Sequence, residues 1–271
     1  TTISFVVPVF NDGDTIEKMV KSLLDQDLPG IEIIAVNDGS TDNSKKVLDG
    51  LAEMDWIKVI NLEKNEGACV ARNEGAKIAQ GKYLSFLPAD AVLYPGMARI
   101  WYEMLEEHPD FDFLYGGYRF IDEDGEPLPG NDLFFQPFDP YALEVTNYID
   151  GSFPIRREAF WKYAKLMNQP EGLWDKNIKS LQDWDFWLSV VRNGGKGIYI
   201  PDIFFGTTMP HPGGLSFDSA NNWLDRTEAI KKKHNIPIRK LCVASLGAGW
   251  HGKRIAQILN ADFKDMPSFK P

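Results

Sequence analysis

The sequence predicts an α/β fold with a mainly parallel central sheet and helices on both of its faces. Over the first ninety residues, short apolar runs alternate with amphipathic segments of helical periodicity. Repeated strand–helix–strand crossovers of this length are typical of parallel sheets, whose strands are buried on both faces. In such sheets, ligands bind at the carboxyl ends of the strands.

The first half of the chain alternates four expected strands with three expected helices. ISFVVPVF is an almost unbroken apolar run, as expected of a buried strand. The segment after it places Ile16, Met19 and Leu23 on one helical face. Asp14 or Thr15 precedes that face as a suitable N-cap. The strands are predicted over 3–10, 31–38, 56–63 and 82–88, and the helices over 14–26, 40–54 and 68–80.

The second half is less regular, and its many aromatic residues indicate a site with flat apolar walls. A proline begins one expected helix, and DEDGE indicates the turn of a hairpin. Helices are predicted over 95–109, 155–167, 181–194 and 221–233, a hairpin over 111–130, a loop-rich stretch over 131–150, and strands with a loop over 196–217.

The tail carries a glycine pattern, Gly247-x-Gly249-x-x-Gly252, between a strand pattern and a helix pattern. Too few residues follow to complete a dinucleotide-binding domain, so we infer no NAD binding. The tail is therefore either the truncated start of a second Rossmann-like domain, which we favour, or a strand–helix extension docked on the first domain. The predicted units are a main domain over 1–235, with halves over 1–94 and 95–235, and a C-terminal extension over 236–271.

Composition excludes several classes of protein. Hydrophobic residues make up 44% of the chain and charged residues 25%, as in ordinary soluble domains. No apolar run approaches the ~20 residues that span a bilayer, so no transmembrane segment is expected. A net charge of −10 argues against a nucleic-acid surface, and the basic run at 231–234 is interpreted as a solvated helix end. Cys69 and Cys242 form no disulfide framework or metal motif, which favours a cytoplasmic location.

The predicted strand ends carry polar and turn-forming residues at 10–12, 37–40, 65–67 and 88–90. Turn preferences explain each of these segments separately. They explain less well why every strand end at one edge of the sheet carries groups suited to a nucleotide and a cation. We therefore expect the functional site at this edge.

Four motifs resemble those of the inverting family-2 glycosyltransferases and follow in the same order. They are PVFNDGDTI at 8–16, VNDGSTDNS at 36–44, NEGACVARNEGAKIAQGKYLSFL at 65–87 and QDWDFWLSV at 182–190. The resemblance implies the GT-A fold, a three-layer α/β/α sandwich. It also implies metal-assisted transfer of a sugar, with inversion, from a nucleoside diphosphate donor such as a UDP-sugar to a hydroxyl of a saccharide or glycoconjugate acceptor.

The resemblance implies a nucleotide site along the strand ends. A carboxylate such as Asp38 can accept the imide N–H of uracil, and Arg72 can reach the base or the diphosphate with planar geometry. A surface salt bridge is the alternative role for Arg72. Ser40 with Thr41 is expected to cap the helix that follows. The implied donor-binding residues are Pro8, Val9, Phe10, Asp12, Asp38, Arg72 and Ala89.

The family's Asp-x-Asp metal motif aligns with YLSFLPADAVL at 83–93. There Mn²⁺ or Mg²⁺ bridges the phosphates of the donor. Pro88 and Ala91 replace carboxylates of the motif, whereas Asp90 is retained. MPHPGGLSF at 209–217 resembles a segment that folds over the donor and adds His211 as a second ligand. The resemblance thus implies an ion held by Asp90, His211 and the donor phosphates, more weakly than usual.

The resemblance assigns the catalytic base to Asp183. Inversion is a single displacement in which one carboxylate removes the proton of the acceptor hydroxyl. Gln182 replaces the glutamate that usually precedes this residue, and Asp185 is a weaker candidate for the base.

Two tryptophans of the QDWDFWLSV motif have two open roles, and two arginines that precede the motif have one expected role. Trp184 and Trp187 either offer flat surfaces to a sugar or an aromatic acceptor, or pack in the core. The segment GSFPIRR resembles the acceptor side of the family's site, so that Arg156 or Arg157 is expected to steady a phosphate.

Two other classes of function stay open from the sequence. Loss of the carboxylates at Pro88 and Ala91, and of the glutamate at Gln182, is consistent with a catalytically impaired nucleotide-sugar-binding module. The tail glycines would suit an NAD-dependent enzyme, which the missing remainder of that domain disfavours. The acceptor is undetermined, and a modified DNA base is disfavoured by the net charge.

Overall fold

A computed structural model of the protein describes residues 1–122, 124–208 and 223–236. The described strands are β1 Ile3–Val9, β2 Glu32–Asn37, β3 Lys58–Asn61, β4 Tyr83–Ser85, β5 Val92–Leu93, β6 Phe113–Ile121, β7 Pro127–Leu133, β8 Ile155–Arg156 and β9 Gly197–Thr208. The described helices are α1 Ile16–Leu24, α2 Ser44–Glu53, α3 Ala68–Ile78, α4 Met97–Glu107, α5 Pro140–Val145, α6 Arg157–Leu166, α7 Gln182–Val191 and α9 Trp223–Lys233.

The described strands form a nine-stranded sheet in the order β3-β2-β1-β4-β8-β6-β9-β5, and β7 pairs with β6 outside this order. β1 pairs in parallel with β2 and β4, β2 with β3, and β6 with β9. All the antiparallel pairings involve β5, β7 or β8. The prediction of an α/β fold with a mainly parallel sheet is confirmed.

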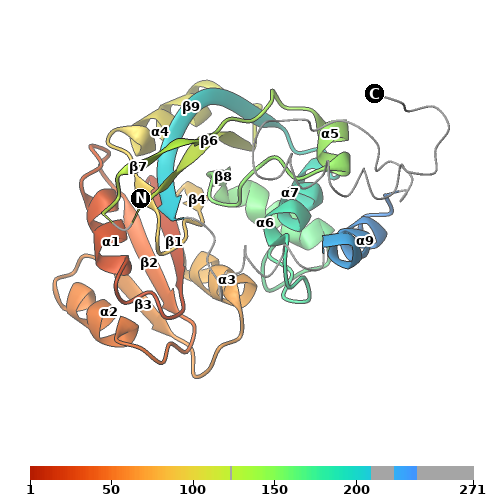
Figure 1. Ribbon diagram of the computed structural model, residues 1–271. Coiled ribbons are helices and arrows are strands. Elements are labelled where there is room, and N and C mark those ends of the chain that lie inside the picture. Colours follow the sequence, from red (N-terminus) through yellow and green to blue (C-terminus); the bar gives the residue numbers. More distant parts are fainter. Residues whose placement is uncertain (123, 209–222, 237–271) are drawn as a thin grey trace.

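Helices cover both faces of the sheet. Figure 1 shows α1 and α2 on one side of β1, β2 and β3, and α3 on the other side. This is the arrangement that right-handed crossovers give when the strand order reverses between β3 and β4. α5, α6, α7 and α9 lie on the side away from α1 and α2 (Figure 1). The layers form the three-layer sandwich that the motifs implied.

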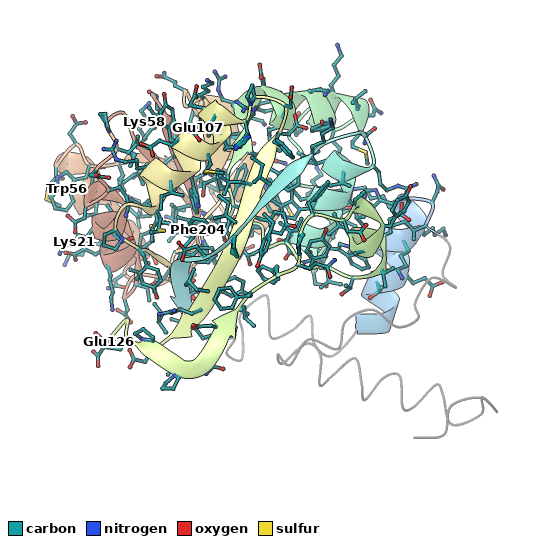
Figure 2. All side chains as sticks on the ribbon, turned by 90° about the horizontal axis from the view of Figure 1, so that it is seen from above. Lys21, Trp56, Lys58, Glu107, Glu126 and Phe204 are labelled. Carbon is teal, nitrogen blue, oxygen red and sulfur yellow. The ribbon has the colours of Figure 1, made fainter. Side chains whose placement is uncertain are left out.

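The apolar runs of the sequence form the core. Every residue of β2 is buried, and so are all residues of β1 except Pro8. Aromatic side chains fill the space between the sheet and the helices, with Phe204 of β9 in the interior and Glu126 at the tip of the β6–β7 hairpin (Figure 2). One aromatic cluster joins Phe86, Trp174 and Phe186, so that α7 is packed against the segment that follows β4. Large buried rings of this kind contribute most of the hydrophobic stabilisation.

The main differences from the predicted elements lie in short segments. β5 and β8 are two residues long, and α5 lies in the stretch predicted to be loop-rich. A two-residue strand has no period to detect, because its pairing depends on partners far away in the chain. Asp139 caps α5 by accepting hydrogen bonds from the amides of Tyr141 and Ala142 at 2.8 Å and 3.2 Å.

The prediction that Ser40 and Thr41 cap the second helix is wrong. α2 begins at Ser44, and its N-cap, Asn43, makes no side-chain capping bond. The Ser40 hydroxyl instead accepts a hydrogen bond from the Asn11 amide at 3.1 Å, and the Thr41 amide donates to Asn11 Oδ1 at 2.8 Å. Both residues therefore tie the loop after β2 to the end of β1.

The basic run at 231–234 is not a solvated helix end, contrary to the prediction. Lys231 and His234 are buried, with 0% and 5% of their surface exposed. Lys233 Nζ lies 2.8 Å from carboxylate oxygens of Asp175 and Asp185. Partners from distant segments, which the local sequence does not contain, determine this burial.

Two sequence predictions fall outside the described residues. They are His211 and the C-terminal extension beyond Ile236. Among the helices that the structure does describe, none has the length and apolarity needed to cross a membrane.

Candidate active site

Asp38 directly follows β2 and lies in the loop at the carboxyl ends of β1 and β2. Its amide donates to the Val9 carbonyl at 2.8 Å, and its two carboxylate oxygens accept from the amides of Glu66 and Gly67 at 2.7 Å and 2.9 Å. Burial raises the pKa of Asp38, although these amide bonds act in the opposite direction. Each oxygen still has a second lone pair. Asp38 therefore holds the loop 65–67 and can accept one more donor.

Gly39 is required where this loop turns. Its φ is +69°, and a Cβ atom at this position would lie 2.5 Å from the carbonyl carbon of Lys64. Only glycine adopts this backbone without strain and leaves that space.

The end of β1 offers an exposed aromatic surface. Phe10 is 43% exposed, and its amide donates to Asp12 Oδ2 at 2.9 Å. The Asp12 amide donates to Ser44 Oγ at 3.0 Å. Asp12 thus shapes the turn that presents Phe10 at the edge of the sheet, next to the half-buried Pro8, whereas the side chain of Val9 is buried in the core.

Asp90 lies beyond β4 and meets the end of β9. Thr207 Oγ1 donates to Asp90 Oδ1 at 3.3 Å, and the Thr208 hydroxyl donates to Asp90 Oδ2. Ala89 and Ala91 are buried, with 3% and 1% of their surface exposed, while Asp90 is half-buried. The turn therefore directs its single carboxylate away from the core.

The described residues contain no cluster of three or more His, Cys, Asp or Glu side chains arranged to hold a metal. A single carboxylate nevertheless suits Mg²⁺ or Mn²⁺, because such ions often bind one or two protein carboxylates together with substrate phosphates. Asp90, with the neighbouring threonine hydroxyls, fits this mode of binding.

Asp183 lies in the first turn of α7. Its Oδ2 accepts from Asn147 Nδ2 at 2.6 Å, and its Oδ1 accepts from the Trp184 amide at 3.0 Å. Burial, together with the charge of Asp150, raises the pKa of Asp183 to about 6. A carboxylate near this value is suited to act as a general base at neutral pH.

The start of α7 is strained. Leu181, which precedes the helix, has a φ of 54° and a left-handed conformation that is unusual for a bulky residue. Residues held in such conformations are common at functional sites. Here the strained residue directly precedes Gln182 and Asp183.

Arg72 reaches across from α3 to the start of α7. Its Nη1 donates to Gln182 Oε1 at 2.9 Å, and its guanidinium lies 4.3 Å from the ring centroid of Trp174. Its Nε is buried without a hydrogen-bond partner among the described residues. The charges of Asp183 and Asp150 act on this guanidinium. Arg72 is therefore not in a surface salt bridge.

Asp150 joins the site, and the sequence reasoning missed it. Its Oδ1 accepts from the Ser152 amide at 2.8 Å, and its carbonyl accepts from Trp187 Nε1 at 3.0 Å. Burial raises the pKa of Asp150, and the charge of Asp90 adds to this effect. The one signal in the sequence is that Asp150 directly precedes GSFPIRR, the segment that resembles the acceptor side of the family's site.

The structure corrects one prediction for α7, and it decides between the two roles that the sequence leaves open for the tryptophans of this helix. Asp185 is not a candidate base, because it is 1% exposed and its oxygens lie 2.8 Å from Lys233 Nζ and His234 Nε2. Trp184 and Trp187 are fully buried in the core. The two rings are therefore not surfaces for a sugar or an aromatic acceptor.

Arg156 and Arg157 do not lie at the site. Arg156 donates to the carbonyls of Phe111, Leu105 and His108, and Arg157 Nε donates to the Gly81 carbonyl at 2.7 Å. These contacts surround the amino end of β4, opposite the edge that carries Asp90. Both arginines stabilise the fold, and the predicted phosphate contact is wrong.

The fold and the site together define a GT-A glycosyltransferase, with strand-end carboxylates on a three-layer sandwich. The chain belongs to glycosyl transferase family 2, whose model matches residues 4–164. It is 32% identical over 195 residues to the putative teichuronic acid biosynthesis glycosyltransferase TuaG of Bacillus subtilis, covering 71% of this chain and 73% of TuaG.

Other similar proteins differ in length from this chain. An uncharacterized glycosyltransferase of Rickettsia conorii is 30% identical over 197 residues, which cover 71% of this chain and 32% of that relative. The chain thus spans about a third of that longer relative.

Two solved structures share the fold. The crystal structure of S. aureus TarS in complex with UDP-GlcNAc has a TM-score of 0.68 at 20% identity, over 98% of this chain and 73% of that chain. The mannosyltransferase PcManGT from Pyrobaculum calidifontis, in complex with GDP-Man and Mn²⁺, has a TM-score of 0.62 at 18% identity, over 98% of this chain and 76% of that chain.

Proposed function

We propose that the protein transfers a sugar from a UDP-sugar to a hydroxyl of a saccharide or glycoconjugate acceptor, with inversion and with Asp183 as the base. The observation that carries this proposal is the Asp183 carboxylate, held by Asn147 and Trp184, with its pKa raised to about 6. The resemblance to TarS, which is solved with UDP-GlcNAc, supports a UDP-sugar as donor.

In the proposed reaction, Asp183 removes the proton of the acceptor hydroxyl. The hydroxyl oxygen forms a bond to the anomeric carbon, and the bond from that carbon to the diphosphate oxygen breaks on the opposite face. The electron pair of the broken bond leaves with UDP. One displacement of this kind inverts the anomeric centre, and general-base catalysis contributes about 10²- to 10⁴-fold to its rate.

The donor would bind along the carboxyl edge of the sheet. Asp38 would accept the uracil imide N–H, and the backbone of Pro8, Val9 and Phe10 would line the base. Arg72, which lies beside the start of α7, would contact the diphosphate, as the resemblance to the family implies.

Asp90 would hold Mn²⁺ or Mg²⁺ together with the donor phosphates, and His211 would be a second ligand. A bound ion would neutralise the charge that develops on the leaving diphosphate. The Mn²⁺ in the PcManGT structure supports this proposal. With Pro88 and Ala91 in the motif, we expect an ion that is readily removed.

Donor hydrolysis and transfer assays with a panel of nucleotide sugars test this function. We expect turnover of a UDP-sugar, loss of turnover with EDTA, and recovery with Mn²⁺ or Mg²⁺. Turnover that is the same with and without EDTA would contradict the proposed metal dependence. The absence of turnover with every donor would contradict the proposed enzymatic activity.

A nucleotide-sugar-binding module without catalysis is the second candidate. The observation that favours it is the replacement of two motif carboxylates by Pro88 and Ala91. Calorimetry that shows metal-independent binding of UDP, together with no hydrolysis or transfer, would establish this candidate.

We also propose a cytoplasmic location. The two cysteines of the sequence form no disulfide framework and Cys69 is a free, buried thiol, as is typical of compartments that keep thiols reduced. Cell fractionation with an antibody against the protein tests this location, and recovery from an extracellular fraction would contradict it.

A further inference from the structure

The segment 150–152 is fastened to two elements that carry the site. Trp187 Nε1 on α7 donates to the Asp150 carbonyl at 3.0 Å, and Ser85 Oγ on β4 donates to the Ser152 carbonyl at 2.7 Å. The Ser152 amide holds Asp150 Oδ1 at 2.8 Å. The Asp150 carboxylate is therefore fixed before any ligand binds.

This segment also passes directly against Asp183. A Cβ atom on Gly151 would lie 3.3 Å from the Cβ of Asp183 and 2.7 Å from Cη2 of Trp174. Glycine is the residue that lets the two chains approach so closely. The carboxylates of Asp150 and Asp183 consequently belong to the same small region.

Asp150 is within electrostatic reach of both ends of the proposed reaction. The charge of Asp90 acts on Asp150, and the charge of Asp150 acts on Asp183. If Asp90 faces the diphosphate and Asp183 faces the acceptor hydroxyl, then the transferred sugar lies between these two residues. Asp150 lies on the segment that is bonded to both α7, which carries Asp183, and β4, which precedes Asp90, and no step of the proposed displacement uses it.

We propose that Asp150 accepts a hydrogen bond from a hydroxyl of the transferred sugar and thereby selects donors that carry this hydroxyl. An ionised carboxylate is an acceptor only, and its bonds to hydroxyl groups are short and strong. A site that is built to bind a hydroxyl discriminates against donors that lack it, because the half-buried carboxylate then loses one of its hydrogen-bond donors. This inference rests on the proposed function.

Binding measurements on the full chain test this role. The ligands are UDP, UDP-glucose, UDP-N-acetylglucosamine and the monodeoxy forms of both sugar nucleotides. We expect Asp150→Ala to weaken at least one sugar nucleotide by about 10- to 100-fold, the range of a hydrogen bond to a charged group. Its affinity for UDP should change by about twofold or less, as for a substitution that touches no UDP contact.

The monodeoxy ligands identify the hydroxyl. One of them should bind the wild-type protein about 10- to 100-fold more weakly than its parent and should show no such loss with Asp150→Ala. Asp150→Asn keeps an oxygen for the Ser152 amide and should give an intermediate loss. Asp202→Asn changes an exposed aspartate on β9 and is the matched control.

Three results would overturn the role of Asp150. They are an equal loss for UDP and the sugar nucleotides, no loss for either, or a rise confined to the KM of the acceptor. Failure of the proposed function is distinguishable, because the wild-type protein would then turn over no donor. Melting temperatures of the variants separate these outcomes from misfolding.

Discussion

Asp183 and Asp150 form a pair of half-buried carboxylates whose properties depend on each other. Burial is the largest cause of the raised pKa at both residues, and the negative charge of Asp150 further disfavours ionisation of Asp183. Asn147 acts in the opposite direction by donating to Asp183 Oδ2. Two predictions at the residue scale follow from this balance.

The first prediction concerns the pH dependence of turnover. Activity should fall below about pH 6, because a protonated Asp183 cannot accept the proton of the acceptor. Asp150→Asn removes a negative charge, lowers the pKa of Asp183 and should move the acid limb of kcat/KM to lower pH. Profiles of kcat/KM against pH measure this shift. An acid limb that stays in place or moves to higher pH would contradict the coupling.

The second prediction concerns stability. Because the pKa of Asp183 is raised from 3.8 to about 6 in the folded protein, ionisation destabilises the fold as pH rises through this window. Asp183→Asn should therefore stabilise the protein at pH 8, by up to about 3 kcal/mol, and change it little near pH 4. Urea unfolding at the two pH values tests this. A variant that is less stable than the wild type at pH 8 would refute it.

At the scale of elements, contacts with distant residues determine the conformation of the turn after β2 and the position of α9, and each can be tested separately. The turn after β2 needs glycine at position 39, and α9 docks on α7 through buried ion pairs. Asp185 is the residue of α7 that meets Lys233 and His234 of the α9 segment.

Gly39→Ala should destabilise the protein by about 2 kcal/mol or more, because the new Cβ meets the Lys64 carbonyl carbon and the backbone is left-handed. Gly50→Ala is the matched control, since no atom lies within 4 Å of its added Cβ in α2. The control should stabilise the helix by about 0.5–1 kcal/mol. Equal effects of the two substitutions in urea unfolding would contradict this interpretation.

Asp185→Ala should destabilise the protein by about 3–5 kcal/mol, because it removes the buried partner of His234 Nε2 and one of the two carboxylates that pair with Lys233. Asp185→Asn keeps the shape and should cost less. Once folded, Asp185→Asn should retain turnover, since Asp185 faces α9. A loss of turnover in this variant as large as that of Asp183→Asn, at equal foldedness, would restore Asp185 as a candidate base.

At the scale of the whole molecule, the parallel half of the sheet was predictable, and so were the β6–β7 hairpin and β9 of the mixed half, whereas β5 and β8 were not. The strands β1 to β4 are continuous apolar runs with regular crossovers, which local sequence records. β5 and β8 pair over two residues each, and their positions depend on long-range partners such as β9 and β4. A pattern that repeats over many residues can be recognised from the local sequence, whereas the position of a two-residue strand cannot.

The same division holds for the site. Asp38, Asp90 and Asp183 lie in motifs, so that the resemblance could propose them as site residues. Asp150 lies outside those motifs and enters the site only because Trp187 and Ser85 fasten its segment to α7 and β4. The ion pairs of α9 were likewise invisible in the run KKKH, whose partners lie on α7 and in the loop before it.

The most direct test of the central claim is the kcat of Asp183→Asn for sugar transfer, measured with the best UDP-sugar and with UDP affinity determined in parallel. We predict a loss of about 10²- to 10⁴-fold in kcat, the contribution of a general base, with UDP affinity essentially unchanged. A variant whose kcat stays within about threefold of the wild type would contradict the assignment of Asp183 as the base, because general-base catalysis contributes far more than that factor.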